Sequence, residues 1–229
     1  MSNFTVTDFM APLGPEGPGP SPEWLQRCAA LLDVDGAAVS LGRGLTELVC
    51  FSDEKSARLD DLQFTLGEGP GVDSAENGAL YLVGDLQQDP GMRWPVFASE
   101  ASAQGVRAVF AFPLRLGTIR LGTLVGHRGT AGPIRKEAVS YGFTISDALA
   151  LFVLAYEAPA NEGGRTQRYS PFGDLRRAVV HQATGMVSEQ LGLPLPNALV
   201  RIRAYAFAHG QPIMLVARGI VDGRVRLPS

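Results

Sequence analysis

The segment from Val106 to Leu114 is the feature that most constrains the fold, because it places β-branched and aromatic residues on both faces of an extended chain. A strand with this pattern lies inside a sheet that is covered on both sides. Pro113 cannot donate to a sheet ladder, so we expect it near the end of the strand. Gly117 then turns the chain into a second apolar run, Ile119–Val125, and the two runs predict an antiparallel pair.

Further elements surround this pair in the sequence. From Ile134 to about Glu157 apolar residues recur at helical spacing and predict a long amphipathic helix. Its expected inward residues are Ala138, Tyr141, Ile145, Ala148, Leu149, Phe152, Val153 and Tyr156. The Gly-rich segment Gly67–Gly71 is expected to be a loop. Also expected are a helix that starts at Pro22, strands at Ala37–Leu41, Leu45–Phe51 and Ala79–Val83, and a helix at Pro95–Gln104. Together they predict an α+β domain over residues 22–157, with an antiparallel sheet flanked by helices.

The last part of the chain has a different pattern. From Asp174 onward apolar residues recur at helical spacing, and Pro196 and Pro212 stand where first helical turns begin. A small all-α domain of three helices is therefore expected over residues 174–229. The first helix is expected to bury Leu175, Ala178, Val179, Ala183, Met186, Val187 and Leu191. Gly185 inside this helix costs about 1 kcal/mol relative to Ala, which predicts that a neighbouring helix or RNA approaches the backbone there.

Composition and charge separate these regions. Residues 1–21 are rich in Gly and Pro and predict a disordered leader, and residues 158–173 predict a linker. The 229-residue chain has a net charge of −3. Seven Arg against three acidic residues from Asp174 onward give the tail a net charge of +4 and leave −7 for the preceding part. A basic module on an acidic body predicts that the tail meets a polyanion.

Two sets of residues resemble known families. The tail is similar to an ANTAR domain in the ordered set Ala183, Gly185, Met186, Ala198, Ile202, Arg203, Ala206, Val216, Ala217, Ile220 and Val221. Residues 22–157 resemble a GAF domain in the segments Leu66–Pro70, Val83–Leu86, Arg93–Ala98 and Gly105–Arg115. The resemblance implies a GAF and ANTAR transcription antitermination regulator of the actinobacterial type, whose sensor domain controls binding to hairpins in leader RNA.

The expected RNA contacts lie on the first two helices of the tail. Sequence-specific RNA binding uses stacking on unpaired bases and cations on phosphates. The expected contacts are Arg177, His181, Thr184, Gly185, Arg201, Arg203, Tyr205 and His209. The third helix begins with the mostly apolar segment Pro212–Ala217, whereas a helix that reads duplex DNA needs polar and basic residues at its leading end. RNA is therefore expected, and a DNA-binding regulator is the alternative.

The GAF resemblance also implies a sensor pocket for a small molecule. Its expected ligand-binding residues are Trp94, Phe110, Phe112 and Leu124. The competing interpretation is a filled core, because aromatic residues in a small sheet domain are more often packed. His127 is expected at the surface, and Asp60 and Asp61 are expected as solvated charges or helix caps.

Several kinds of chemistry are disfavoured. Cys28 and Cys50 stand in apolar patterns and are expected to be buried, and Gly71 stands where related sequences carry a cysteine. The sequence has no Walker loop, HExxH motif or Ser/His/Asp order, so we expect no enzyme activity, no metal and no cofactor. The alternatives are a GAF-fold ligand-binding or thiol-redox protein and a tail that only docks protein. No apolar run reaches the roughly 20 residues of a membrane span, so we expect a cytoplasmic homodimer, joined through its long helix, with no membrane contact.

Overall fold

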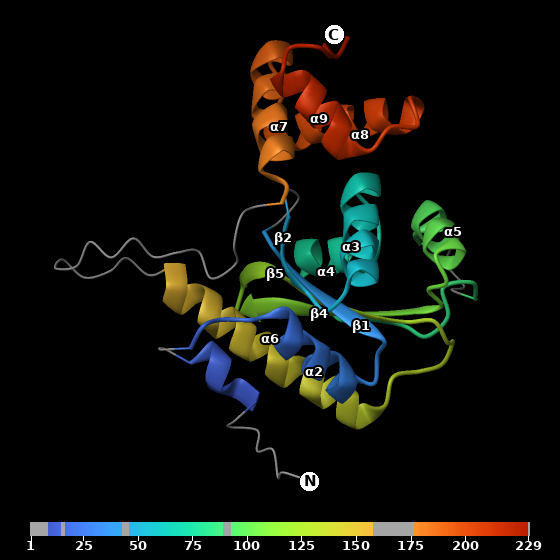
Figure 1. Ribbon diagram of the computed structural model, residues 1–229, viewed down its shortest axis with the longest axis vertical. Coiled ribbons are helices and arrows are strands. Elements are labelled where there is room, and N and C mark those ends of the chain that lie inside the picture. Colours follow the sequence, from blue (N-terminus) through green and yellow to red (C-terminus); the bar gives the residue numbers. More distant parts are fainter. Residues whose placement is uncertain (1–8, 15–16, 43–45, 89–92, 158–175, 229) are drawn as a thin grey trace, which may run out of the picture.

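The computed structural model describes residues 9–14, 17–42, 46–88, 93–157 and 176–228. Figure 1 shows a sheet domain with helices on both sides of one twisted sheet, and a helical tail that lies beyond β2 (Glu47–Phe51) and α3 (Glu54–Leu66). The predicted linker, residues 158–173, lies outside the described residues. The two bodies therefore come from the two regions that differ in apolar pattern.

The sheet has five strands in the order β2-β1-β5-β4-β3, and every neighbouring pair is antiparallel. Besides β2, the strands are β1 (Gly36–Leu41), β3 (Tyr81–Val83), β4 (Ala108–Leu116) and β5 (Ile119–Arg128). The predicted pair is β4 and β5, and it lies inside the sheet as expected. Pro113 differs from expectation because it lies within β4, opposite Thr123. Pro113 lies beyond the part of β4 that pairs with β3, which reaches only to Ala111, and the register with β5 shifts between Leu114 and Arg115.

Helices cover both faces of the sheet, as the apolar pattern of β4 predicts. One face carries α2 (Pro22–Leu32) and α6 (Lys136–Glu157), and the other carries α3, α4 (Pro70–Asn77) and α5 (Pro95–Ala103) (Figure 1). Strand side chains alternate between the two cores, so Phe110 and Phe112 pack with the first pair of helices. Val109 and Ala111 pack in the second core. The mixed fold with an antiparallel sheet is confirmed.

The long helix α6 packs on β4 with Ile145 buried, as predicted, but Tyr141 is 44% exposed instead of facing inward. Gly142 takes the inward place, because the Phe112 ring lies 2.2 Å from where its Cβ would be and leaves no room for a side chain. Within the described residues, Lys136–Ala155 is the one helical stretch long and apolar enough to cross a membrane by length and composition. Of its most apolar window, 44% is buried inside the protein.

Part of the expected leader packs on the sheet domain. Phe9, which precedes the 3-10 helix η1 (Ala11–Leu13), is 7% exposed and stacks on Trp24 with 5.5 Å between ring centroids. The indole N–H of Trp24 donates to the Phe9 carbonyl oxygen at 2.9 Å. These residues differ from the disordered leader that Gly and Pro content indicated, because one aromatic pair with a buried hydrogen bond anchors the segment.

The predicted loop at Gly67–Gly71 is a tight junction between two helices. α3 ends at Gly67, whose φ of 70° lies in the left-handed region, and Pro70 starts α4. The backbone N–H of Gly71 donates to the Gln63 side-chain oxygen at 2.7 Å. Gly71 is thus inside α4 rather than in a loop, and the hydrogen bond from its N–H to the Gln63 side chain joins the start of α4 to α3.

The tail folds as α7 (Ala178–Leu191), α8 (Leu195–Ala208) and α9 (Ile213–Val221), which matches the three expected helices. They enclose a core of Val180, Ala183, Val187, Ala198, Leu199, Ile202, Ala206, Ile213, Val216, Ala217 and Ile220. The inward face of α7 differs from expectation. Met186 is 42% exposed, whereas Thr184 is buried, and its hydroxyl is satisfied by donating to the Val180 carbonyl oxygen at 2.7 Å. No described atom outside the helix backbone lies within 4 Å of a Cβ built at Gly185, so the neighbouring helix expected there is absent from the described part.

Candidate functional site at the domain interface

The amino end of α7 is capped by the sheet domain. The backbone N–H of Arg177, the residue before α7, donates to both carboxylate oxygens of Glu47 at 2.8 and 3.0 Å. The first N–H groups of a helix have no partner within the helix and carry partial positive charge, so a carboxylate stabilises them. Glu47 lies at the start of β2 and is 7% exposed. A residue of one domain therefore completes a helix of the other.

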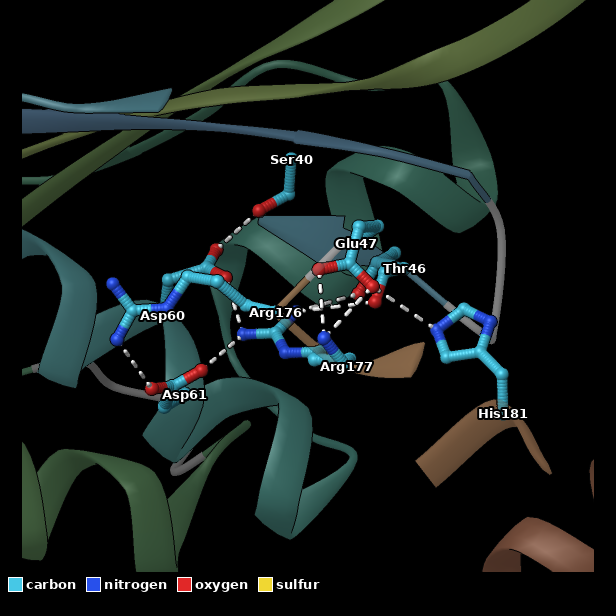
Figure 2. A network of polar contacts seen from close by, with 8 residues as sticks. All are labelled: Ser40, Thr46, Glu47, Asp60, Asp61, Arg176, Arg177 and His181. Atoms are coloured by element: carbon cyan, nitrogen blue, oxygen red, sulfur yellow. Dashed lines mark hydrogen bonds and ion pairs between the residues drawn. The ribbon is translucent and has the colours of Figure 1, made fainter. Parts of the chain in front are cut away.

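The side chain of Arg177 makes the second contact between the domains. Its Nη2 lies 2.7 Å from an oxygen of Asp60 and 2.6 Å from an oxygen of Asp61, both on α3, and Nη1 donates to the Thr46 carbonyl oxygen at 3.2 Å (Figure 2). Ser40 of β1 in turn donates to Asp60 at 2.8 Å. We call the set of Glu47, Asp60, Asp61 and Arg177 the clamp.

Burial and charge have opposite effects on the clamp. The Arg177 side chain is 1% exposed, and such burial by itself lowers the pKa of a guanidinium. The charges of Asp60 and Asp61 and their hydrogen bonds more than offset this, so the pKa of Arg177 is raised above its usual value. Removing one partner of a buried ion pair leaves an uncompensated charge and costs about 3–5 kcal/mol. The loss of any buried member of the clamp therefore destabilises the protein.

His181 extends the clamp by one turn of α7. Its Nε2 lies 3.4 Å from an oxygen of Glu47 (Figure 2). Burial lowers the pKa of His181 and outweighs the charge of Glu47, which raises it, while the charge of Arg177 lowers it further. At neutral pH the imidazole is therefore uncharged, and its approach to Glu47 is a polar contact rather than an ion pair.

The structure separates the eight expected RNA contacts into two groups. Arg177 and Thr184 are buried, and His181 and Arg203 are half-buried. This differs from the expectation of RNA-facing side chains, because carboxylates of the sheet domain occupy Arg177 and the helix backbone occupies the Thr184 hydroxyl. Gly185, Arg201 and His209 are exposed, and Tyr205 is half-buried and stacks on His209 with 3.9 Å between ring centroids.

The four expected ligand-binding residues do not meet in one pocket. Trp94 is 5% exposed, and its indole N–H donates to an oxygen of Asp73 at 3.2 Å beside a hollow of about 380 Å³. Phe110, Phe112 and Leu124 instead pack in the core on the opposite face of the sheet. Alternation along β4 and β5 is the reason, because residues at even positions of β4 face away from α5.

Sequence reasoning missed the acidic half of the clamp. Asp60 was expected as a solvated charge or a helix cap but is 6% exposed and pairs with Arg177, and His127, expected at the surface, is 2% exposed with its Nε2 3.1 Å from the Ser56 hydroxyl. The one available signal was position, because Asp60 lies four residues before the buried Phe64 and so shares its side of α3. Cys28 and Cys50 are buried as predicted, and burial raises the pKa of Cys50 to about 12 and that of Cys28 further.

Comparison with known proteins finds no matching family model and no matching curated protein. Among solved structures, the chain is similar to the GAF domain of an Acinetobacter phosphoenolpyruvate-protein phosphotransferase, with 12% identity, a TM-score of 0.49, and coverage of 71% of this chain and 100% of that chain. A GAF domain region of a putative membrane protein from Geobacter sulfurreducens has 16% identity and a TM-score of 0.47, and covers 58% of this chain and 89% of that chain. The GAF domain of the Coxiella burnetii phosphotransferase has 17% identity and a TM-score of 0.44, with coverage of 58% and 82%. The fold class itself rests on the strand order and helix layers described above.

Proposed function

We propose that this chain is a sensory transcription regulator in which a GAF-type domain controls an ANTAR-like tail that binds hairpins in leader RNA. The observation that carries the proposal is the burial of the Arg177 guanidinium between Asp60 and Asp61. Phosphate oxygens suit a guanidinium in the same way that carboxylate oxygens do. RNA and the sheet domain are therefore competing partners for the same side chain.

The docked state also occupies the amino end of α7. A helix amino end attracts anions through its free N–H groups, and Glu47 fills that place. When the tail leaves the sheet domain, it presents Arg177, His181 and this helix end together. The tail's net charge of +4 favours a polyanion once these groups are free.

The rival functions are weaker on particular grounds. A DNA-reading third helix needs polar and basic residues at its leading end, whereas Ile213 and Val216 are buried in the tail core and the exposed Leu215 is apolar. A thiol switch needs a thiolate, and the raised pKa of Cys50 opposes one at neutral pH. The proposal therefore assigns RNA binding without catalysis to a cytoplasmic protein.

The test removes the clamp from the sheet side, so that the tail keeps its sequence. Asp60→Asn with Asp61→Asn weakens docking, and we expect full-length protein to bind hairpin RNA about tenfold more tightly, equivalent to about 1.4 kcal/mol. Glu54→Gln with Glu100→Gln removes the same charge from exposed positions and is the matched control. Fluorescence titration with hairpin, scrambled-loop and duplex DNA probes measures the effect. Equal affinity of the clamp variant and the control, or a preference for duplex DNA, contradicts the proposal.

We also propose that the protein forms a homodimer through the exposed side of α6. Phe143 is 39% and Leu151 is 56% exposed there, whereas Phe152 and Val153 face the sheet domain. Exposed apolar side chains on a long helix favour pairing with a second copy. Sedimentation of the Leu151→Asp variant against the wild type tests this, and a monomeric wild type contradicts it.

A further inference from the structure

A groove of about 660 Å³ lies where the two domains meet beside the clamp. One wall is formed by Leu66 and Gly67 at the end of α3 and by Val96 of α5. The other wall is formed by Val200, Arg203 and Phe207 of α8. The groove is distinct from the hollow beside Trp94 and contains none of the ligand-binding residues expected from the sequence. It is of the size that small-molecule sites have in proteins.

Arg203 provides the only cation among the described residues that line this groove. Its guanidinium lies over the ring of Phe64 with 5.1 Å to the centroid, and its Nε is buried without a hydrogen-bond partner in the described structure. Neither an ion pair nor a hydrogen bond joins it to any described side chain, in contrast to Arg177, which holds two carboxylates. Burial and the charge of Arg177 lower the pKa of Arg203 to about 10, while the charge of Glu76 opposes them, so Arg203 is charged at neutral pH.

The end of α3 explains why a guanidinium can lie there unpaired. Nη1 of Arg203 is 2.8 Å from where a Cβ of Gly67 would stand, so the missing side chain leaves room for the cation. The carboxyl end of a helix carries partial negative charge and attracts a cation without binding all of its N–H groups. The fold thus positions the guanidinium at the groove without pairing its terminal nitrogens with any described side chain.

Apolar side chains on both walls are open to solvent. Val96 is 39%, Val200 is 58% and Phe207 is 72% exposed. Glu68 also lines the groove, and one of its oxygens accepts the N–H of Phe97 at 2.7 Å, which fixes a negative charge nearby. Any anion in the groove meets this like charge, and the repulsion grows with the charge of the anion, so a monoanion that balances Arg203 is favoured over a dianionic phosphate.

We propose that the groove binds a small amphipathic monoanion, with its carboxylate on Arg203 and its apolar body against Val96, Val200 and Phe207. Guanidinium and carboxylate form paired, charge-assisted hydrogen bonds, which fixes the orientation of the ligand. Because both domains supply the walls, the ligand binds the docked arrangement and stabilises it. This last consequence, and only this one, rests on the proposed function.

The test uses the full-length protein and two probes of matched shape. Isothermal titration is carried out with 4-phenylbutyrate and with the uncharged 4-phenylbutan-1-ol. We expect the carboxylate to bind at least about tenfold more tightly than the alcohol, because a hydrogen bond to a charged group contributes that much. Arg203→Gln should remove this preference. Arg201→Gln, an exposed position on the same helix, is the matched control and should retain it.

A second variant tests the site in case Arg203→Gln also changes how the two domains dock. Val200→Asp alters an exposed side chain, so the fold is retained while a carboxylate repels the anion, and we expect phenylbutyrate binding to weaken by about tenfold. Equal binding of acid and alcohol, or undiminished binding in both variants, overturns the site. If phenylbutyrate binds but leaves RNA affinity unchanged, the site stands and its coupling to RNA fails. If the clamp variants bind RNA more tightly while phenylbutyrate does not bind, the site fails and the proposed function stands.

Discussion

Two arginines of the tail meet the same aromatic ring in opposite electrostatic settings. Arg177 and Arg203 lie over Phe64 with 4.1 and 5.1 Å to its centroid. Arg177 is enclosed and paired with two carboxylates, and its pKa is raised, whereas Arg203 borders a groove without a paired acid among the described residues, and its pKa is lowered to about 10. Burial of a cation therefore has two outcomes within one interface. The carboxylates around Arg177 fix the two domains together. Arg203 has no paired carboxylate among the described residues, so an anion can bind it.

The largest expected effect on stability comes from removing Arg177, the paired arginine. Arg177→Met keeps an apolar stem on Phe64 but leaves Asp60 buried without its cation, and we expect a loss of about 3–5 kcal/mol in the free energy of unfolding. Arg203→Met removes a cation that has no paired acid, so the loss should be well below that of Arg177→Met. Urea unfolding followed by circular dichroism measures both variants.

Arg176→Met is the control for the larger effect, because Arg176 is exposed and its nearest oxygen of Asp61 is 4.0 Å away. It should change the free energy of unfolding by less than about 1 kcal/mol. Equal losses in the Arg177 and Arg203 variants contradict the distinction between the two arginines.

The next effect concerns the helix end rather than the side chain. Glu47→Gln keeps an acceptor for the Arg177 N–H but removes the negative charge, and we expect a loss of about 0.5–2 kcal/mol in the free energy of unfolding. The loss should shrink at high salt only slightly, because Glu47 is 7% exposed. A variant as stable as the wild type in low salt shows that the carboxylate does not cap α7.

Acid should weaken both the sheet domain and the clamp. Burial is the largest cause that lowers the pKa of His127, and Lys55 adds to it while Asp53 and Asp35 oppose it. A histidine whose folded-state pKa is below its unfolded value of about 6.5 stabilises the fold above that pH, and the stability is lost as the pH falls through the folded pKa. The slope is at most about 1.4 kcal/mol per pH unit for each proton.

His127→Gln should reduce this slope between pH 7.5 and 5.5 without removing it, because the pKa of His181 is also lowered. Urea unfolding across this range measures the slope, and His209→Gln at an exposed position is the control. A slope that is unchanged by His127→Gln shows that folding does not lower the pKa of His127.

The sequence indicates the elements of this fold better than it indicates which side of each element is buried. The apolar run of β4 predicts a covered interior strand, but it has no polar face, so nothing in it tells which core Phe110 enters. Tyr141 of α6 faces solvent because Phe112 takes the space over Gly142, a contact between distant parts of the chain. The spacing of apolar residues and the composition are local properties of the sequence. Which side of an element is buried depends on the surface that packs against it.

The candidate site could be predicted in part for the same reason. The three tail helices and the basic charge of the tail follow from local pattern, whereas Arg177 was expected to contact RNA and instead pairs with carboxylates of the sheet domain. Its carboxylate partners could not be named, because Glu47 and Asp60 precede it in the chain by more than a hundred residues. A buried charge is recognised only when its counter-charge is known.

The smallest expected effect on stability concerns Gly185, where no described atom outside the helix backbone lies near the position of a Cβ. Gly185→Ala should stabilise the protein by about 1 kcal/mol, because alanine costs less than glycine inside a helix and nothing described crowds the new Cβ. Urea unfolding measures this gain. Hairpin RNA titration on the Asp60→Asn, Asp61→Asn background then asks whether RNA approaches the same backbone, since a close approach turns the added methyl group into a clash. We expect the Gly185→Ala variant to be more stable than its parent and to bind hairpin RNA more weakly. Unchanged RNA affinity in the more stable variant places the RNA elsewhere on the tail.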